Sequence, residues 1–116
     1  MAGVPQNFGV GAPVALTDGA TITLDLSTLA QQGNFFSVTL GGSRTLNITN
    51  MIKGQILRLR VTQDGTGSRV LTVNVNGVAA LVSGTPLTTT AAAVDLVEVM
   101  FDGDDGFYYP IAKAFS

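Results

Sequence analysis

The chain has 116 residues and a net charge of −2, and it contains neither Cys nor His. A chain of this length is expected to form one domain whose core needs no disulfide or metal. Without Cys and His, thiolate zinc sites, disulfide frameworks and histidine general bases are excluded, which leaves few routes to enzymatic catalysis.

The surface is expected to be poor in charge. Charged residues make up 12% of the chain, against about 25% in average globular domains. The six basic residues are scattered, which argues against a nucleic-acid partner because phosphate recognition requires a basic surface. No run of about eighteen apolar residues occurs, and the N-terminus lacks the features of a signal peptide. We therefore expect a protein made in the cytoplasm, with no membrane contact.

Residues 1–13 show no strand or helix period and are rich in Gly and Pro. Such a composition cannot form a packed element by itself. Val4, Phe8 and Val10 nevertheless supply apolar side chains that a purely solvated tail does not need. A mobile terminus and an arm that becomes ordered on a partner both fit this pattern. We predict the arm, with Val4, Phe8 and Val10 as partner-binding residues.

From residue 20 onward, hydrophobic residues alternate with polar ones. Alternation with many β-branched residues predicts strands that have one buried face. Turn sequences separate the strands at roughly 8–12 residue intervals, which is typical of an all-β sandwich or barrel. We predict a single-domain, antiparallel β-sandwich of jelly-roll type over residues 14–116, with about eight strands. The clearest strand sequences are residues 20–27, 35–40, 56–63, 69–76 and 94–101.

Two of these strands are expected to form a central hairpin. Alternation places one set of side chains in the core and leaves Arg58 and Arg60 on the opposite face, available to a partner. The predicted core residues of this hairpin are Leu57, Leu59, Val61, Leu71, Val73 and Val75.

The loop between them, QDGTGS, superficially resembles a glycine-rich phosphate loop. A dinucleotide-binding fingerprint needs a third glycine three residues after Gly67, where this chain has Val70, and a phosphate loop needs a Lys that is absent. Both motifs also require a helix to follow, and a strand sequence follows here. We interpret the loop as a hairpin turn in which Gly67 adopts a positive φ, and we predict no cofactor.

The sequence DGDDG contains Asp102, Asp104 and Asp105, whose carboxylates are possible cation ligands. A calcium loop of the EF-hand type requires an acid at its fifth position and Glu at its twelfth, which are Gly106 and Lys113 here. We therefore predict a polar hairpin turn and no metal site, with weak cation binding as the alternative.

The aromatic sequence FYY follows this turn. Alternation places Phe107 and Tyr109 on one face of a strand and Tyr108 on the other. Aromatic side chains serve both cores and interfaces, and we assign Tyr108 to partner binding.

No catalytic residues are predicted, because no Ser or Thr has a recognisable base and no G-x-S-x-G motif occurs.

Four segments together resemble a β-rich module of tailed bacteriophages. They are LTDGATITLDLS, FSVTLGGSRTL, KGQILRLRVTQDGTGSRVLTV and VDLVEVMFDGDDGFYYP, which span about residues 16–110 in the same order and with similar gaps. The most specific pieces are TLGGSRTL and QDGTGSRVLT, each a turn flanked by strand residues. Relatives of this pattern often carry Trp near Val73 and in the last strand, whereas this chain has no Trp.

The module occurs as small virion proteins and at the C-terminus of tail-fibre or appendage proteins. The resemblance therefore implies a non-enzymatic virion protein on the outer capsid surface. Such a protein decorates or cements the capsid by bridging neighbouring subunits of the major capsid protein, as a homo-oligomer, either trimer or dimer. The alternative is an appendage tip that binds a host-surface receptor or carbohydrate.

Overall fold

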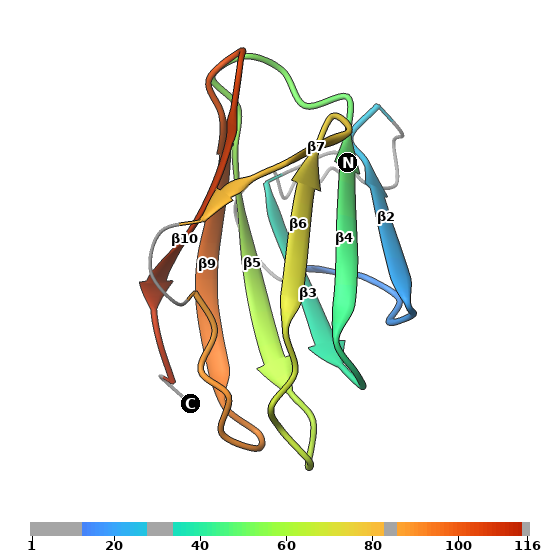
Figure 1. Cartoon of the computed structure of the whole chain (residues 1–116), viewed down its shortest axis with the longest axis vertical. Coiled ribbons are helices and arrows are strands. Elements are labelled where there is room, and N and C mark those ends of the chain that lie inside the picture. Colours follow the sequence, from blue (N-terminus) through green and yellow to red (C-terminus); the bar gives the residue numbers. More distant parts are fainter. Residues whose placement is uncertain (1–12, 28–33, 83–85, 115–116) are drawn as a thin grey trace, which may run out of the picture.

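The computed structural model describes residues 13–27, 34–82 and 86–114, and strands are the only regular elements within these ranges. They form two sheets around one hydrophobic core, to which both sheets contribute (Figure 1). The prediction of an all-β fold is confirmed. In the same ranges, no helix is long and apolar enough to cross a membrane.

The larger sheet, sheet A, has six strands in the spatial order β1-β3-β5-β9-β10-β8. Strands β1, β3 and β5 are parallel to one another, whereas β9 and β10 form an antiparallel hairpin beside β5. Strand β8 pairs in parallel with β10 at the edge. The bounds are Val14–Ala15 for β1, Phe35–Leu40 for β3, Ile56–Gln63 for β5, Leu81–Val82 for β8, Val94–Phe101 for β9 and Gly106–Ala112 for β10.

The smaller sheet, sheet B, has four strands in the order β2-β4-β6-β7. Its first three strands are parallel, and β7 is antiparallel to β6. The bounds are Thr21–Asp25 for β2, Arg44–Thr49 for β4, Leu71–Val75 for β6 and Val78–Ala79 for β7.

From β1 to β6 the chain changes sheet at every step, so each coil contributes one strand to sheet A and one to sheet B (Figure 1). This path resembles a solenoid, and the predicted antiparallel jelly roll is wrong for this part of the chain. Strands β5 and β6, expected to form a central hairpin, lie in different sheets. Alternation predicts which side chains of a strand are buried, but it does not predict which strands pair. The same alternation occurs in parallel and in antiparallel sheets.

The predicted burial is nevertheless confirmed. Arg58 and Arg60 are exposed on the outer side of β5, while their neighbours in the strand face the core. The six predicted core residues, Leu57, Leu59, Val61, Leu71, Val73 and Val75, are none of them more than 3% exposed.

After β6 the chain crosses from one sheet to the other through residues 78–82, which we call the strap (Figure 1). The Asn76-Gly77 turn that precedes it has a positive φ at both residues, as a tight hairpin between β6 and β7 requires. Within the strap, the Ala80 amide donates to the Val73 carbonyl oxygen at 2.9 Å. The strap thus contains β7, the terminal strand of sheet B, and β8, the terminal strand of sheet A.

Candidate interaction face

The outer face of sheet A carries the largest group of aromatic and basic side chains among the described residues. Register aligns Ile56, Met100 and Phe107 in one row across the sheet, and Phe35, Arg58, Glu98 and Tyr109 in the next. Ser37, Arg60 and Leu96 continue the pattern in a third row. We call these outward-pointing residues of β3, β5, β9 and β10 the sheet A face.

Glu98 lies at the centre of this face and binds a residue on each side. Arg58 Nε donates to one carboxylate oxygen at 3.1 Å, and the Tyr109 hydroxyl donates to the other at 2.5 Å. The hydrogen bond to Glu98, reinforced by burial, raises the pKa of Tyr109 to about 12. The Arg58 side chain remains 51% exposed, so the ion pair contributes only about 0–1 kcal/mol to stability. Its main effect is to orient Arg58 and Tyr109.

Partly exposed apolar side chains surround this row, namely Phe35, Leu96, Met100 and Phe107. A hollow of about 320 Å³ lies between Phe35, Arg58 and Leu96. Aromatic residues, Met and Arg are the residue types enriched in protein–protein interfaces, and Tyr and Arg are frequent among the residues that dominate binding energy. The sheet A face therefore has the composition of a protein-binding surface.

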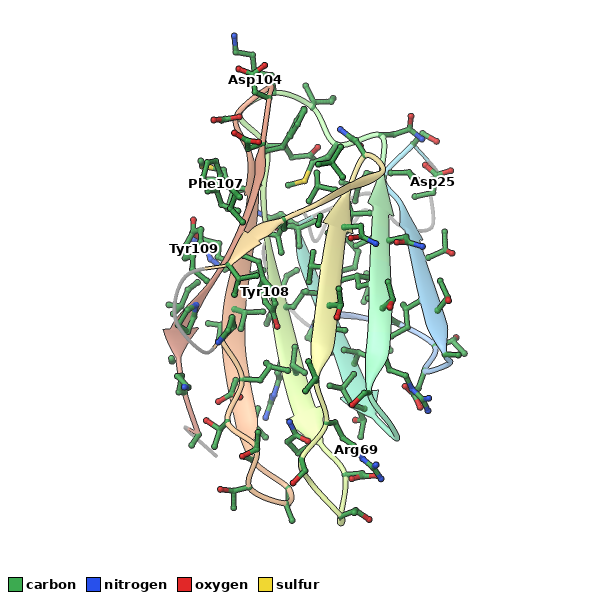
Figure 2. All side chains as sticks on the ribbon, in the orientation of Figure 1. Asp25, Arg69, Asp104, Phe107, Tyr108 and Tyr109 are labelled. Carbon is green, nitrogen blue, oxygen red and sulfur yellow. The ribbon has the colours of Figure 1, made fainter. Side chains whose placement is uncertain are left out.

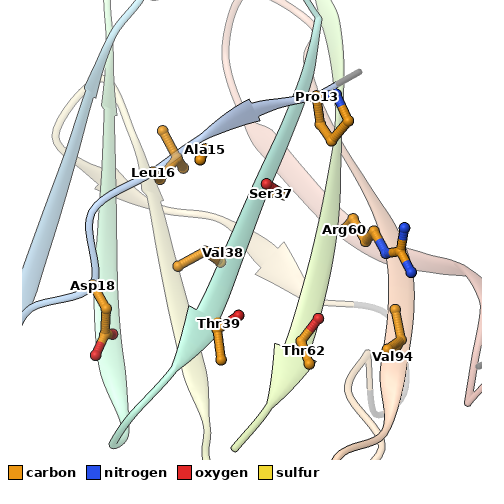
Figure 3. Close-up of a pocket in the computed structure, with 10 residues that line it drawn as sticks. All are labelled: Pro13, Ala15, Leu16, Asp18, Ser37, Val38, Thr39, Arg60, Thr62 and Val94. Atoms are coloured by element: carbon orange, nitrogen blue, oxygen red, sulfur yellow. The ribbon is translucent and has the colours of Figure 1, made fainter. Parts of the chain in front are cut away.

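A groove of about 520 Å³ adjoins this face where β1, β3, β5 and the start of β9 meet (Figure 3). Pro13 and Val94 supply apolar walls, while Arg60 and Thr62 supply polar groups. Asp18 also lines the groove, but its carboxylate is held by the Nε and Nη2 atoms of Arg44, each at 2.8 Å. The Arg44 hydrogen bond lowers the pKa of Asp18.

The outer face of sheet B is chemically different. Its outward residues are short polar ones aligned across three parallel strands, and Asn74 Nδ2 donates to Asn47 Oδ1 at 2.9 Å. The sheet B face consists of the row Thr21, Thr45 and Thr72, the row Thr23, Asn47 and Asn74, and the pair Asp25 and Thr49 at the ends of β2 and β4.

The loop QDGTGS is a turn, as predicted, but it connects the two sheets and is not a hairpin. Gly67 has a φ of 76°, which confirms the predicted positive value. The Asp64 carboxylate accepts hydrogen bonds from the amides of Thr66 and Gly67 and from the Arg69 guanidinium. The Arg69 hydrogen bonds make the largest contribution to lowering the pKa of Asp64 to about 2. The donors that a phosphate would need are thus occupied by the loop's own carboxylate.

Gln63, which sequence reasoning did not single out, holds this loop in place. Its side chain is buried, donates to the carbonyl oxygens of Arg69 and Thr88 at 2.9 Å each, and accepts from the Arg69 amide at 3.0 Å. The only available signal was an amide residue at a position that alternation assigns to the core.

The sequence DGDDG forms the predicted turn between β9 and β10. One carboxylate oxygen of Asp102 accepts hydrogen bonds from the amides of Asp104 and Asp105, at 2.8 and 2.7 Å. The hydrogen bond from the Asp105 amide is the main cause of the lowered pKa of Asp102. No group of acidic side chains in the described ranges has the arrangement of a metal site.

Tyr108 does not lie on the surface, so the prediction that it binds a partner is wrong. Register puts it opposite Val99, a core residue, and its side chain is 2% exposed. Figure 2 shows Phe107 and Tyr109 on the outer side of β10 instead. Burial raises the pKa of the Tyr108 hydroxyl, which has no hydrogen-bond partner among the described residues.

Of the other predicted partner-binding residues, Arg58 lies in the central row of the sheet A face and Arg60 lines the adjoining groove. Val4, Phe8 and Val10 lie outside the described residues. No family model, curated protein or solved structure matches this chain.

Proposed function

We propose that this chain is a structural protein of a bacteriophage virion that binds the major capsid protein on the outer surface of the capsid. The observation that carries the proposal is the sheet A face, whose aromatic, Met and Arg side chains surround an oriented Arg58–Glu98–Tyr109 row. A surface of this kind suits a flat protein partner, and the resemblance to phage virion modules supplies the class of partner. Decoration requires neither a catalytic residue nor a cofactor.

The mechanism is stabilisation by binding to the assembled state. A subunit that contacts two neighbouring capsid proteins binds the intact shell more tightly than separated capsid proteins, so its binding energy opposes disassembly. The effect increases with the concentration of the decorating chain. The chain is made in the host cytoplasm and joins the shell as a homo-oligomer.

The test is co-sedimentation with capsids of the phage whose genome encodes the chain. We expect the wild-type chain to sediment with capsids, and Met100→Glu on the sheet A face to weaken binding by at least about tenfold, since burying an unpaired charge is costly. The matched control is Thr72→Glu on the sheet B face, which should bind like the wild type. Equal binding by all three proteins, or no binding by the wild type, contradicts the proposal.

A second candidate is an appendage tip that binds a host-surface receptor or carbohydrate. The sheet B face favours it, because aligned hydroxyl and amide groups suit a hydroxyl-rich ligand. Antibody labelling of virions separates the two candidates, because decoration places the chain over the shell and the alternative places it at the tail. For the alternative, Thr72→Glu should weaken adsorption to host cells, whereas Met100→Glu should not.

A further inference from the structure

A pocket beside Tyr108 reaches from the surface into the interior of the molecule. It has a volume of about 90 Å³ and lies between the start of β6, the loop that leads into β9, and Tyr108 of β10. Its walls include Leu71 and Leu87, which are buried, and Val70, which is 57% exposed. The pocket therefore opens at Val70, and the buried Tyr108 forms its inner end between the two sheets.

The hydroxyl group of Tyr108 has no hydrogen-bond partner in the part of the chain that the structure describes, although it is buried. Native proteins rarely leave a buried hydroxyl in this state, because the lost hydrogen bonds to water are not replaced. The neighbouring Tyr109 shows the usual arrangement, since its hydroxyl donates to Glu98. A phenylalanine at position 108 would supply the same ring without the unpaired group. The hydroxyl therefore indicates a partner that is not part of the described chain.

The missing partner is a hydrogen-bond acceptor. Burial and, after it, the negative charge of Asp95 raise the pKa of Tyr108, so its hydroxyl stays protonated and is available as a donor. The Asp95 carboxylate itself accepts hydrogen bonds from the Thr88 amide and hydroxyl, at 2.6 and 2.9 Å, and from the Ala114 amide at 2.6 Å. Asp95 is thus satisfied by other donors, and its charge disfavours an anion in the pocket.

The walls restrict the ligand to a small, neutral and mostly apolar molecule. Among the described residues that line the pocket, only Arg69 is charged, and its guanidinium is held by Asp64 at 2.9 Å. Water suits the inner end poorly, because a buried water usually makes about three hydrogen bonds and Tyr108 offers one. An apolar cavity of about 150 Å³ accepts benzene, so the buried part of the ligand has no more than about six non-hydrogen atoms.

We propose that this pocket, which we call the Tyr108 pocket, binds a small neutral molecule whose carbonyl or ether oxygen accepts a hydrogen bond from the Tyr108 hydroxyl. The apolar part of the molecule contacts Leu71 and Leu87, and a longer molecule extends past Val70 into solvent. The single buried donor fixes the orientation of the ligand, as polar groups in mostly apolar binding sites do. This binding does not depend on the proposed attachment to a capsid.

NMR titration of the isotope-labelled full chain with cyclopentanone, a carbonyl compound of the expected size, tests this inference. We expect saturable shifts of the Leu71, Leu87 and Tyr108 amide signals. Tyr108→Phe should weaken cyclopentanone binding by about fivefold or more, because the carbonyl oxygen loses its donor. The same variant should bind cyclopentane as the wild type does, since that probe has no acceptor.

The matched control is Tyr109→Phe, which removes the hydroxyl of the neighbouring residue on the outer side of β10 and should leave the binding of both probes unchanged (Figure 2). Because the chain has two tyrosines, this variant also isolates Tyr108, and its near-ultraviolet difference absorbance reports the hydrogen bond to cyclopentanone. Circular dichroism and thermal unfolding establish that both variants are folded. Tyr108→Phe should melt no lower than the wild type, because it removes an unpaired buried hydroxyl.

A wild-type chain without saturable shifts in cyclopentanone overturns the inference, and so do shifts confined to other parts of the chain. Equal weakening of cyclopentanone and cyclopentane binding by Tyr108→Phe also overturns it, because the hydroxyl would then not be the donor. The same holds if Tyr109→Phe weakens cyclopentanone binding as much as Tyr108→Phe does. Because no capsid is present, these outcomes are independent of the proposed decoration of the shell.

Discussion

Gly67 illustrates, at the scale of single residues, how closely the loops of this molecule approach each other. A Cβ atom there would lie 2.7 Å from both the Thr89 carbonyl oxygen and the Ala91 amide nitrogen, and its φ is positive. Gly67→Ala should therefore lower the free energy of unfolding by about 2 kcal/mol or more, since the left-handed conformation alone costs roughly 1–2 kcal/mol. Urea unfolding measures the loss.

The control is Gly65→Ala in the same loop. No atom lies within 4 Å of a Cβ built at Gly65, so this change should alter stability by no more than about 0.5 kcal/mol. Similar losses at the two glycines would show that the approach of Gly67 to Thr89 and Ala91 is not a packed contact.

The Tyr109 hydroxyl should lose its proton only at an unusually high pH. Its hydrogen bond to Glu98 stabilises the neutral phenol, so the folded-state pKa of about 12 lies above the ordinary value of 10.0. A group with a raised folded pKa contributes stability that is present below its unfolded pKa and is lost as pH rises through the folded pKa. That contribution should disappear between about pH 10 and pH 12.

Ultraviolet absorbance of tyrosinate follows this titration. Tyr108→Phe isolates the Tyr109 signal, because the chain has two tyrosines. Adding Glu98→Gln removes the carboxylate and should return the Tyr109 pKa toward 10.0. An unchanged titration curve after that substitution would contradict the role assigned to Glu98.

At the scale of elements, β5 carries the core on one side and the sheet A face on the other. Leu59 is fully buried, so Leu59→Ala should lower the free energy of unfolding by about 2–5 kcal/mol. Arg58→Ala, one residue away and exposed, should cost no more than about 1 kcal/mol. Chemical denaturation of the two variants compares the two sides of β5 directly. A larger loss of unfolding free energy in Arg58→Ala than in Leu59→Ala would mean that Arg58, and not Leu59, faces the core.

The sequence was sufficient to predict this orientation but not the neighbours of β5. Leu57, Leu59 and Val61 alternate with exposed residues, and that period is set by the geometry of the strand itself. The parallel partner β3 is separated from β5 in sequence by β4, which our reading of the sequence did not identify as a strand. Pairing between distant strands leaves no local pattern, so the solenoid-like path could not be derived from alternation.

The candidate site was predictable to a similar extent. Arg58 and Arg60 were placed on an outer face by alternation alone. The association of Arg58 with Glu98 and Tyr109 depends on the register of β5, β9 and β10, which the sequence does not specify. Alternation placed Tyr108 on the opposite side of its strand from Phe107 and Tyr109, but it did not indicate which side of β10 faces the core.

At the scale of the whole molecule, every aspartate with a shifted pKa is shifted downward, with hydrogen bonds as the main cause. These residues are Asp18, Asp25, Asp64 and Asp102. Each contributes stability that is present above the ordinary carboxyl pKa of 3.8 and is lost as pH falls through the lower folded-state pKa. The melting temperature should therefore be steady above about pH 5 and fall between about pH 4 and pH 2.

Asp64→Asn tests this assignment, because Asp64 has a folded pKa of about 2. The variant should melt below the wild type at neutral pH and show a smaller further decrease in acid. Parallel pH profiles for the two proteins would mean that the Asp64–Arg69 pair does not contribute to acid sensitivity.

We predict that residues 1–13 form an arm that binds a partner outside the domain. The first described residue of the hydrophobic core is Leu16. Because the Gly- and Pro-rich composition of residues 1–13 cannot form a packed element by itself, deleting residues 2–12 should leave the melting temperature nearly unchanged. Ordering an arm costs roughly 1–2 kcal/mol per residue in backbone entropy, so Val4, Phe8 and Val10 contribute only where a partner covers them.

The truncated chain should therefore dissociate from capsids faster than the full chain, although it folds equally well. Co-sedimentation after dilution measures this retention, and Met100→Glu in the full chain provides the comparison in which the arm is intact but the sheet A face is impaired. If the arm and the face contact capsid proteins separately, combining the two changes should weaken retention more than either alone, because the losses of distant, independent sites add. A truncated chain that unfolds, or that is retained as well as the full chain, would show that residues 1–13 are not a partner-binding arm.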